Sequence, residues 1–282
     1  MLSTPTREPH AQRWSRAQGH APYDPKPPCR AAVSPSRPHA RGLATLAWPQ
    51  GRNVHVWRLD LRDMGADAAA LLDATETERA QRFVYANDWR RYVAAHAWLR
   101  RILGAYLGVP PQQLRFATSP HGKPVLLQAS RGVGPSPLCF NLSHSKDLAL
   151  IAVTAGIEVG VDIEAVRSDL PGPDLAAGVL SATELDELAQ CAAADHADSF
   201  VGCWTRKEAC LKALGVGLQL EPRGLHVGLH PQRQTVQLDG VDAPIDITPL
   251  AAPSGHCAAL AVVGGFAHIE PQDAAHLPEW RT

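Results

Sequence analysis

Two carboxylates lie two positions apart in the segment Gly-Val-Asp-Ile-Glu at residues 160–164. If this segment is a β-strand, Asp162 and Glu164 point to the same side while the residues beside them face the core. Neighbouring carboxylates repel each other unless water or a cation lies between them, and a hard divalent ion such as Mg2+ suits oxygen ligands. On this spacing alone, the solvated polar face of an edge strand is favoured, and a metal site is the alternative.

A second group of charged side chains lies in Trp-Thr-Arg-Lys-Glu-Ala-Cys-Leu-Lys at residues 204–212. On a helix, Glu208 and Lys212 are neighbours at positions i and i+4. Trp204 and Leu211 turn part of the same side toward the core. Such a pair can present a carboxylate to a metal and an ammonium to a phosphate. The alternative is an ordinary salt bridge on a solvated helix.

Two further motifs carry groups that could bind phosphate. In Phe-Asn-Leu-Ser-His-Ser at 140–145, Ser143 and His144 are adjacent and point apart, and no Gly-x-Ser-x-Gly turn exposes a serine. These two side chains suit hydrogen bonding to a phosphate better than nucleophilic catalysis. His-Gly-Lys-Pro at 121–124 predicts a tight turn that presents Lys123 as a point charge. A satisfied loop histidine and a solvated turn lysine are the alternatives.

The elements that must position these motifs alternate between strand and helix patterns. Residues 54–61 alternate apolar and polar side chains, which predicts a half-buried strand. Residues 75–107 carry a helical apolar stripe, with Asp73 or Thr75 able to cap its start. The order of elements then repeats, and short segments echo each other, such as ATETERAQ at 74–81 and ATELDELAQ at 182–190. We expect an α+β fold of two similar α/β halves in a pseudo-twofold arrangement.

The expected division is a tail at 1–42, an N-terminal half at 43–155 and a C-terminal half at 156–282. The tail is rich in proline and arginine and has no apolar period, so we expect it to be disordered. The whole chain has 27 Lys and Arg against 28 Asp and Glu, which argues against a nucleic-acid binder. No apolar run is long enough to cross a bilayer, and the scattered cysteines fit a reducing compartment. We expect a soluble cytoplasmic protein that binds neither nucleic acid nor membrane.

The order and spacing of the four motifs resemble those of the 4'-phosphopantetheinyl transferases. His-Gly-Lys-Pro, Phe-Asn-Leu-Ser-His-Ser, Gly-Val-Asp-Ile-Glu and the tryptophan-to-lysine motif follow each other within residues 121–212. The resemblance covers about residues 52–265. Two halves in one chain are similar to the long, monomeric, pseudo-dimeric (Sfp-like) type, which modifies carrier proteins of peptide and polyketide synthesis. The metal and catalytic motifs fall in the C-terminal half.

The resemblance implies an enzyme that moves the phosphopantetheine arm of coenzyme A onto a serine of an acyl, polyketide or peptidyl carrier protein. Adenosine 3',5'-bisphosphate is released, and the enzyme is expected to be a monomer. The implied Mg2+ ligands are Asp162, Glu164 and Glu208. Glu208 is also the implied general base, and Lys212 the residue that neutralises the pyrophosphate. The other implied contacts to coenzyme A phosphates are Arg79, Arg91, Lys123, Ser143 and His144.

The resemblance also gives roles to Glu184, which would organise the site, and to Lys207, which would be structural or a secondary phosphate contact. Two other functions stay open at this point. One is a metal-dependent phosphohydrolase acting on a nucleotide through the same carboxylates and basic residues. The other is a carrier-binding scaffold without catalysis, against which the intact acidic and basic motif residues argue. The cognate carrier and pathway are not specified by the sequence.

Overall fold

A computed structural model of the chain describes residues 45–127, 136–167, 173–217 and 220–277. The tail predicted at 1–42 lies outside the described residues. Among the helices of the described part, none has the length and apolar character that a membrane span requires.

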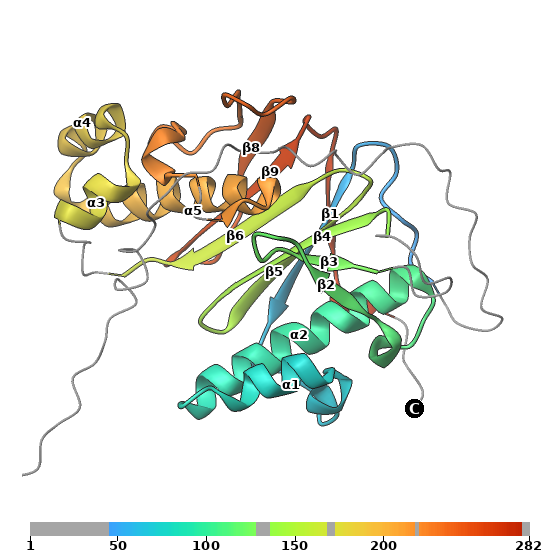
Figure 1. Cartoon of the computed structure of the whole chain (residues 1–282). Coiled ribbons are helices and arrows are strands. Elements are labelled where there is room, and N and C mark those ends of the chain that lie inside the picture. The colour runs from blue at the N-terminus through green and yellow to red at the C-terminus, as the bar shows by residue number, and fades with distance from the viewer. Residues whose placement is uncertain (1–44, 128–135, 168–172, 218–219, 278–282) are drawn as a thin grey trace, which may run out of the picture.

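Four strands form the first sheet, and two helices pack below it in Figure 1. In spatial order the strands are β10 (Ile269–Gln272), β1 (Val54–Asp60), β5 (Leu148–Ala155) and β4 (Leu138–Ser145). The helices are α1 (Ala74–Gln81) and α2 (Ala86–Leu107), and the hairpin that follows them is β2 (Phe116–Thr118) and β3 (Pro124–Leu126). β1 pairs antiparallel with β5 and parallel with β10.

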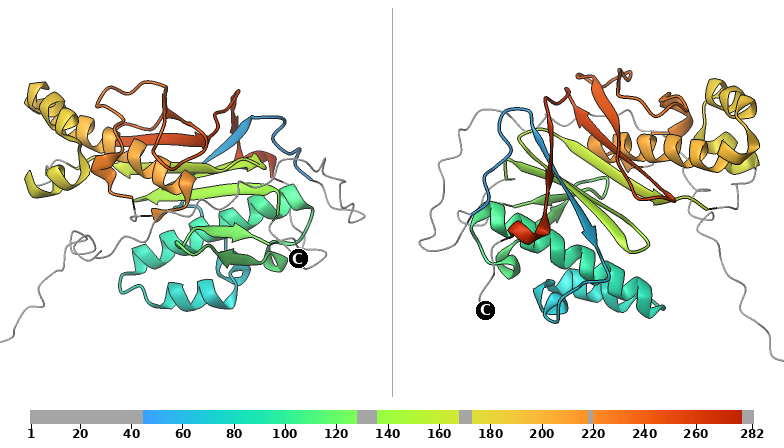
Figure 2. Two further views of the ribbon diagram at one scale, coloured as in Figure 1. Left: turned by 45° about the horizontal axis from the view of Figure 1, so that its top comes forward. Right: turned by 180° about the vertical axis from the view of Figure 1, so that it is seen from behind.

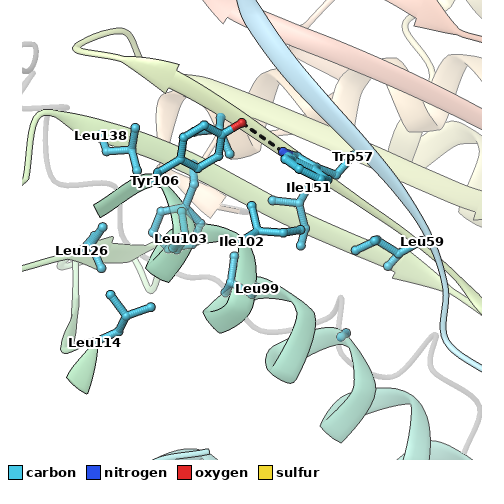
Figure 3. Packing of buried hydrophobic residues seen from close by; sticks show 14 of the residues in the cluster. Trp57, Leu59, Leu99, Ile102, Leu103, Tyr106, Leu114, Leu126, Leu138 and Ile151 are labelled. Carbon is cyan, nitrogen blue, oxygen red and sulfur yellow. Dashed lines mark hydrogen bonds between the residues drawn. The ribbon is translucent and has the colours of Figure 1, made fainter. Parts of the chain in front are cut away.

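The apolar stripe of α2 packs against this sheet and forms the core of the first half. Leu99, Ile102 and Tyr106 recur every three to four residues, so that one side of the helix is buried. They lie opposite Trp57 of β1 and Ile151 of β5 (Figure 3). The indole Nε1 of Trp57 donates a hydrogen bond of 3.2 Å to the Tyr106 hydroxyl. This contact ties α2 to one of the two inner strands of the sheet.

The single helix predicted over residues 75–107 is wrong in one respect, because residues 82–85 divide it into α1 and α2. The segment contains exposed Phe83, Val84 and Tyr85, and aromatic and β-branched residues are weak helix formers. The predicted cap is confirmed at Asp73. Its side chain accepts from the Glu76 backbone N–H at 2.9 Å, and the Glu76 side chain accepts from the Asp73 backbone N–H at 3.0 Å.

The second sheet is antiparallel throughout and is covered by the long helix α5 (His196–Leu214). In spatial order its strands are β6 (Val159–Ala165), β9 (His256–Val263), β8 (Ile245–Leu250) and β7 (Gln234–Val236). Two short helices flank α5, namely α3 (Pro173–Val179) and α4 (Ala182–Gln190). Single 3-10 turns lie at Ala68–Leu71, Pro111–Gln113, Ala193–Asp195, Pro222–Gly224 and Ala274–His276.

The two sheets meet where β4 lies beside β6, each the outer strand of its own sheet. Alternate side chains of β4 accept hydrogen bonds from the backbone of β6. The pairs are Asn141 Oδ1 with Val161 N at 2.9 Å, Ser143 Oγ with Ile163 N at 3.4 Å, and Ser145 Oγ with Ala165 N at 3.0 Å. These side chains take the place of the backbone acceptors that a neighbouring strand would offer to an unpaired strand edge. They set the register of β6 relative to β4.

The predicted α+β fold class is confirmed, since each half contains a four-stranded sheet with a long helix on one face. One strand crosses the division expected between residues 155 and 156. Ile269–Gln272, assigned from the sequence to the C-terminal half, is β10 and pairs with β1 of the first sheet. The view from behind in Figure 2 shows this last strand beside β1. The predicted range 156–282 therefore does not coincide with the second sheet.

Candidate active site

Asp162 and Glu164 project from β6 on the side that faces α5. Asp162 is 1% exposed, and its Oδ1 accepts hydrogen bonds from Ser143 Oγ at 2.8 Å and Lys212 Nζ at 2.5 Å. Its Oδ2 is also buried and has no hydrogen-bond partner among the described residues. Glu164 is less buried and accepts a hydrogen bond from Ser145 Oγ at 3.1 Å. The serines of β4 therefore orient both carboxylates of β6.

Glu208 and Lys212 lie one turn apart near the end of α5. Lys212 Nζ donates to Ser143 Oγ at 3.1 Å in addition to its ion pair with β6. The helix ends at a glycine in the left-handed conformation, Gly215 with φ 68°, whose N–H donates to Leu211 O at 3.0 Å. Lys212 therefore lies in the last turn, where the helix dipole favours a cation.

A glycine allows α5 to lie unusually close to β6. A Cβ atom at Gly160 would lie only 2.0 Å from the backbone oxygen of Ala209 and 2.3 Å from the backbone nitrogen of Ala213. Gly160 is on the same side of β6 as Asp162 and Glu164, because it precedes them at even spacing. The missing side chain thus brings the acidic residues of β6 within reach of the helix that carries the other two charged groups.

Burial and mutual repulsion raise the pKa values of two carboxyls in this cluster. The pKa of Glu164 is raised to about 7, first by burial and then by the charge of Asp162, with Glu208 adding to it. The pKa of Glu208 is raised to about 7 by burial and by Asp162. Burial lowers the pKa of Lys212, but the charges of Asp162, Glu208 and Glu164 outweigh it and raise that pKa overall. One ammonium therefore faces three carboxylates.

This excess of buried negative charge fits a divalent cation, which prefers oxygen ligands. The unpartnered Oδ2 of Asp162 is a ligand atom available for it. Within the described ranges, no three His, Cys, Asp or Glu side chains are already arranged as a metal site. Lys212 Nζ is bonded to Asp162 Oδ1, so one oxygen of the cluster is held by the ammonium. The residues present therefore suit a cation that binds together with an anionic ligand able to draw Lys212 away.

A group of basic side chains lies around His144, on the face of β4 opposite Ser143. The pKa of His144 is lowered to about 4, first by burial and then by positive charges from neighbouring residues. These neighbours are His96, Lys212, Arg91 and Arg79. Such a cluster attracts a phosphate, whose charge would offset this repulsion.

Arg79 and Arg91 reach this cluster from α1 and α2. The Arg79 guanidinium lies 5.6 Å from the centre of the Tyr92 ring. Arg91 pairs with Asp147 at 3.0 Å and with Asp88 at 3.5 Å, so part of its charge is neutralised within the protein. The structure therefore brings together both arginines, His144, Ser143 and Lys212. It places the remaining predicted contact, Lys123, in a different environment that is described below.

Sequence reasoning missed His96, which lies on α2 among these basic residues. Its Nδ1 is 2.9 Å from Glu76 Oε1, and its ring centre is 4.1 Å from that of Tyr92. The spacing of four between Tyr92 and His96 would have predicted a shared helix face. Asn141 and Ser145 were also missed, although each lies two positions from the predicted Ser143 and therefore on the same face of the strand.

Glu184 and Lys207 form an ion pair in which neither side chain is exposed, with a distance of 2.6 Å. Lys207 Nζ also donates to the carbonyl oxygens of Pro222 and Leu225. Burial raises the pKa of Glu184, but the hydrogen bonds from Lys207 and from the backbone of Ser181 and Val227 outweigh burial, so that this pKa is lowered overall. Of the two roles suggested for Lys207, the structural one fits this environment. The pair joins α4 to α5 and thereby supports the helix that carries Glu208.

Replacing Lys207 by methionine should lower the free energy of unfolding by about 3–5 kcal/mol, because it leaves the Glu184 carboxylate buried without its partner. Urea denaturation at neutral pH measures the change. Arg223→Gln is the matched control, since it removes an exposed ion pair of 2.7 Å with Glu221 and should cost less than about 1 kcal/mol. Equal losses in the two variants would show that the buried pair has no special structural role.

The amino-acid sequence also matches proteins of known family over most of its length. It is 36% identical over 217 residues to the 4'-phosphopantetheinyl transferase HetI of Nostoc sp., which covers 76% of this chain and 88% of HetI. The chain belongs to the 4'-phosphopantetheinyl transferase family. The family description "4'-phosphopantetheinyl transferase superfamily" matches residues 158–261, and "4'-phosphopantetheinyl transferase, N-terminal" matches residues 57–156.

Other phosphopantetheinyl transferases are similar over shorter segments. The transferase psf-1 of Bacillus pumilus is 33% identical over 167 residues, or 58% of this chain and 67% of psf-1. The human L-aminoadipate-semialdehyde dehydrogenase-phosphopantetheinyl transferase is 29% identical over 178 residues, or 58% of this chain and 55% of the human protein. The two family matches together include every predicted site residue. This phosphopantetheinyl transferase is therefore an enzyme that transfers its group to carrier proteins.

Proposed function

We propose that the protein transfers the 4'-phosphopantetheine group of coenzyme A to a serine of an acyl, polyketide or peptidyl carrier protein and releases adenosine 3',5'-bisphosphate, with Mg2+ bound. The observation that carries this proposal is the meeting of three carboxylates and Lys212 beside a basic cluster. With a cation bound to the carboxylates, these groups are complementary in charge to a pyrophosphate linked to a further phosphate. β4 of the first half and β6 and α5 of the second supply the site, which supports a monomer as the active form.

Asp162, Glu164 and Glu208 are the residues that would hold Mg2+. The bound ion would offset negative charge on the pyrophosphate of coenzyme A. Lys212 lies beside the same carboxylates and can turn to the pyrophosphate once Asp162 is neutralised by another cation. Positioning and charge stabilisation of this kind supply most of the catalysis in phosphoryl transfer.

Glu208 is the proposed general base. In the reaction, a bond forms between the carrier serine oxygen and the β-phosphorus of coenzyme A, and the bond from that phosphorus to the departing bisphosphate breaks. Glu208 takes the serine proton and returns it to solvent. Its raised pKa of about 7 makes it a stronger base than an ordinary carboxylate. Its half-buried position on α5 limits competing hydrogen bonds from water.

Arg79, Arg91 and His144 are proposed to bind the 3'-phosphate of coenzyme A, while Ser143 lies between them and the carboxylates. Arg79 contributes charge, and Arg91 shares its charge with Asp147 and Asp88. A phosphate at this point would offset the repulsion that lowers the pKa of His144. His144 could then take up a proton and pair with the phosphate as a cation.

The decisive experiment is incubation with coenzyme A, Mg2+ and a panel of fatty-acid, polyketide and peptidyl carrier proteins, followed by intact-mass measurement. A transferase adds the mass of one phosphopantetheine group to a carrier and adds nothing to the carrier whose acceptor serine is alanine. Hydrolysis of coenzyme A without a mass gain on any carrier would favour the alternative of a phosphohydrolase. Binding of carriers with neither change would favour a scaffold.

Magnesium binding should become tighter as the pH rises from about 6 to about 8. The pKa values near 7 of Glu164 and Glu208 lie above those of unfolded carboxyls, so at the lower pH both groups hold protons that Mg2+ must displace. We expect the dissociation constant to fall by about tenfold or more over this range. Isothermal titration calorimetry in two buffers also measures the protons released. A dissociation constant that does not change with pH would contradict the assignment of these ligands.

A further inference from the structure

Lys123 lies at the turn between β2 and β3 but points away from solvent, into the contact between the two halves. Its side chain is 10% exposed. The Ser119 hydroxyl accepts from the Lys123 backbone N–H at 3.0 Å, and the Ser119 N–H donates to the Lys123 carbonyl at 2.8 Å. The turn is therefore fixed at its base, and the lysine stem extends from it along Gly215, where a Cβ would lie 3.1 Å from Lys123 Cδ.

The ammonium of Lys123 is bonded to three acceptors in the second half of the chain. Nζ lies 2.6 Å from Glu158 Oε2, 3.1 Å from the carbonyl oxygen of Val159 and 3.1 Å from the carbonyl oxygen of Ala213. A lysine ammonium has three protons, so these contacts use its full donor capacity. No donor is left for a phosphate while they are in place.

The three acceptors lie in or directly before the two elements that carry the catalytic cluster. Val159 is the first residue of β6, which carries Asp162 three positions later, and Glu158 directly precedes this strand. Ala213 is in the last turn of α5, directly after Lys212. A cation at this end of a helix also pairs favourably with the helix dipole. The hairpin of the first half therefore holds the start of β6 and the end of α5 together.

We propose that Lys123 is a positioning residue that locks β6 and α5 in the geometry needed for transfer, and not a contact to the phosphates of coenzyme A. The inference rests on the proposed function, because it assigns to Lys123 a role in that reaction. A phosphate contact acts mainly on the binding of coenzyme A. A positioning residue acts on the alignment of the reacting groups, for which small displacements lower the rate strongly.

The test compares Lys123→Met with Lys123→Arg and Glu158→Gln by hydrogen exchange and by steady-state kinetics. In Lys123→Met, we expect the amides of residues 211–215 to exchange about fivefold faster or more, since the last turn of α5 loses its anchor. We expect kcat to fall about tenfold while KM for coenzyme A stays within about twofold. Lys123→Arg should recover part of kcat. Glu158→Gln should lower kcat in the same direction and add little in the Lys123→Met background.

Arg79→Met is the matched control, because it should raise KM for coenzyme A without changing exchange in α5. The proposal is overturned if Lys123→Met raises KM tenfold and leaves kcat and α5 exchange unchanged. If Lys123→Met fails to fold, Glu158→Gln provides the test. Unchanged kcat and unchanged hydrogen exchange in the Glu158→Gln variant would also overturn the proposal. The exchange measurement needs no substrate. A protein without transferase activity but with faster exchange at residues 211–215 would reject the proposed function and keep the anchoring role.

Discussion

Exchanging Glu208 for glutamine is expected to lower kcat for carrier modification by roughly 10³-fold at saturating Mg2+, because an amide cannot take the proton of the carrier serine. The change keeps the shape of the side chain, so the packing of α5 on β6 should be retained. The measurement is single-turnover modification of a carrier protein, followed by intact mass. Undiminished modification by this variant with Mg2+ present would show that Glu208 is neither the base nor a necessary ligand.

Protein stability provides the control for this variant. The folded-state pKa of Glu208 is about 7, above that of an unfolded glutamate, so the charged form is disfavoured in the folded protein. This cost is fully present above about pH 7, and glutamine removes it. The melting temperature of the metal-free Glu208→Gln variant should therefore rise at about pH 8. Asp198→Asn, in the first turn of the same helix, should leave kcat unchanged. A lower melting temperature in Glu208→Gln would mean that lost activity reflects lost structure.

Replacing Gly160 by alanine is expected to have the other large effect. The added Cβ would meet backbone atoms of Ala209 and Ala213 at 2.0 and 2.3 Å, and a helix backbone cannot turn aside as a flexible side chain can. α5 must therefore move away from β6, which separates Glu208 and Lys212 from Asp162. We expect a loss of about 3 kcal/mol in the free energy of unfolding and about 10²-fold or more in kcat.

Gly178→Ala is the matched control for this substitution. Gly178 lies in α3, and a Cβ there would have no heavy atom within 4 Å. Alanine favours helix more than glycine does, so this variant should be neutral or slightly more stable. Denaturant titration and carrier modification assays on both variants give the comparison. Wild-type stability and activity in Gly160→Ala would mean that the close approach of α5 is not needed.

The parts of the site that depend on local spacing could be predicted from the sequence. Asp162 and Glu164 share a face because side chains alternate along a strand, and Glu208 and Lys212 are neighbours because a helix repeats every 3.6 residues. The capping box at Asp73 is equally local. These predictions need no knowledge of which element packs on which.

The parts that depend on contacts between distant segments could not. The local sequence around Lys123 is compatible with a solvated turn residue. Its contacts with Glu158 and Ala213, which follow 35 and 90 positions later, are visible only in the folded structure. Asn141 and Ser145 likewise have the pattern of ordinary strand residues, and their role as acceptors for the β6 backbone depends on the packing of β6 beside β4. A charge pattern shows which groups could pair, but only the packing of the two halves decides which of them do.

The pairing of β10 with β1 has a consequence for how the enzyme is made. One of the two outer strands of the first sheet, β10, is encoded at residues 269–272, more than two hundred positions after its neighbour β1. During synthesis from the N-terminus, β1 can pair with its parallel partner β10 only after the strands of the second sheet have left the ribosome. Strand pairing across such a separation is slow, because a long chain loop must close first. A nascent chain that stalls before residues 269–272 therefore leaves one edge of β1 without its partner strand.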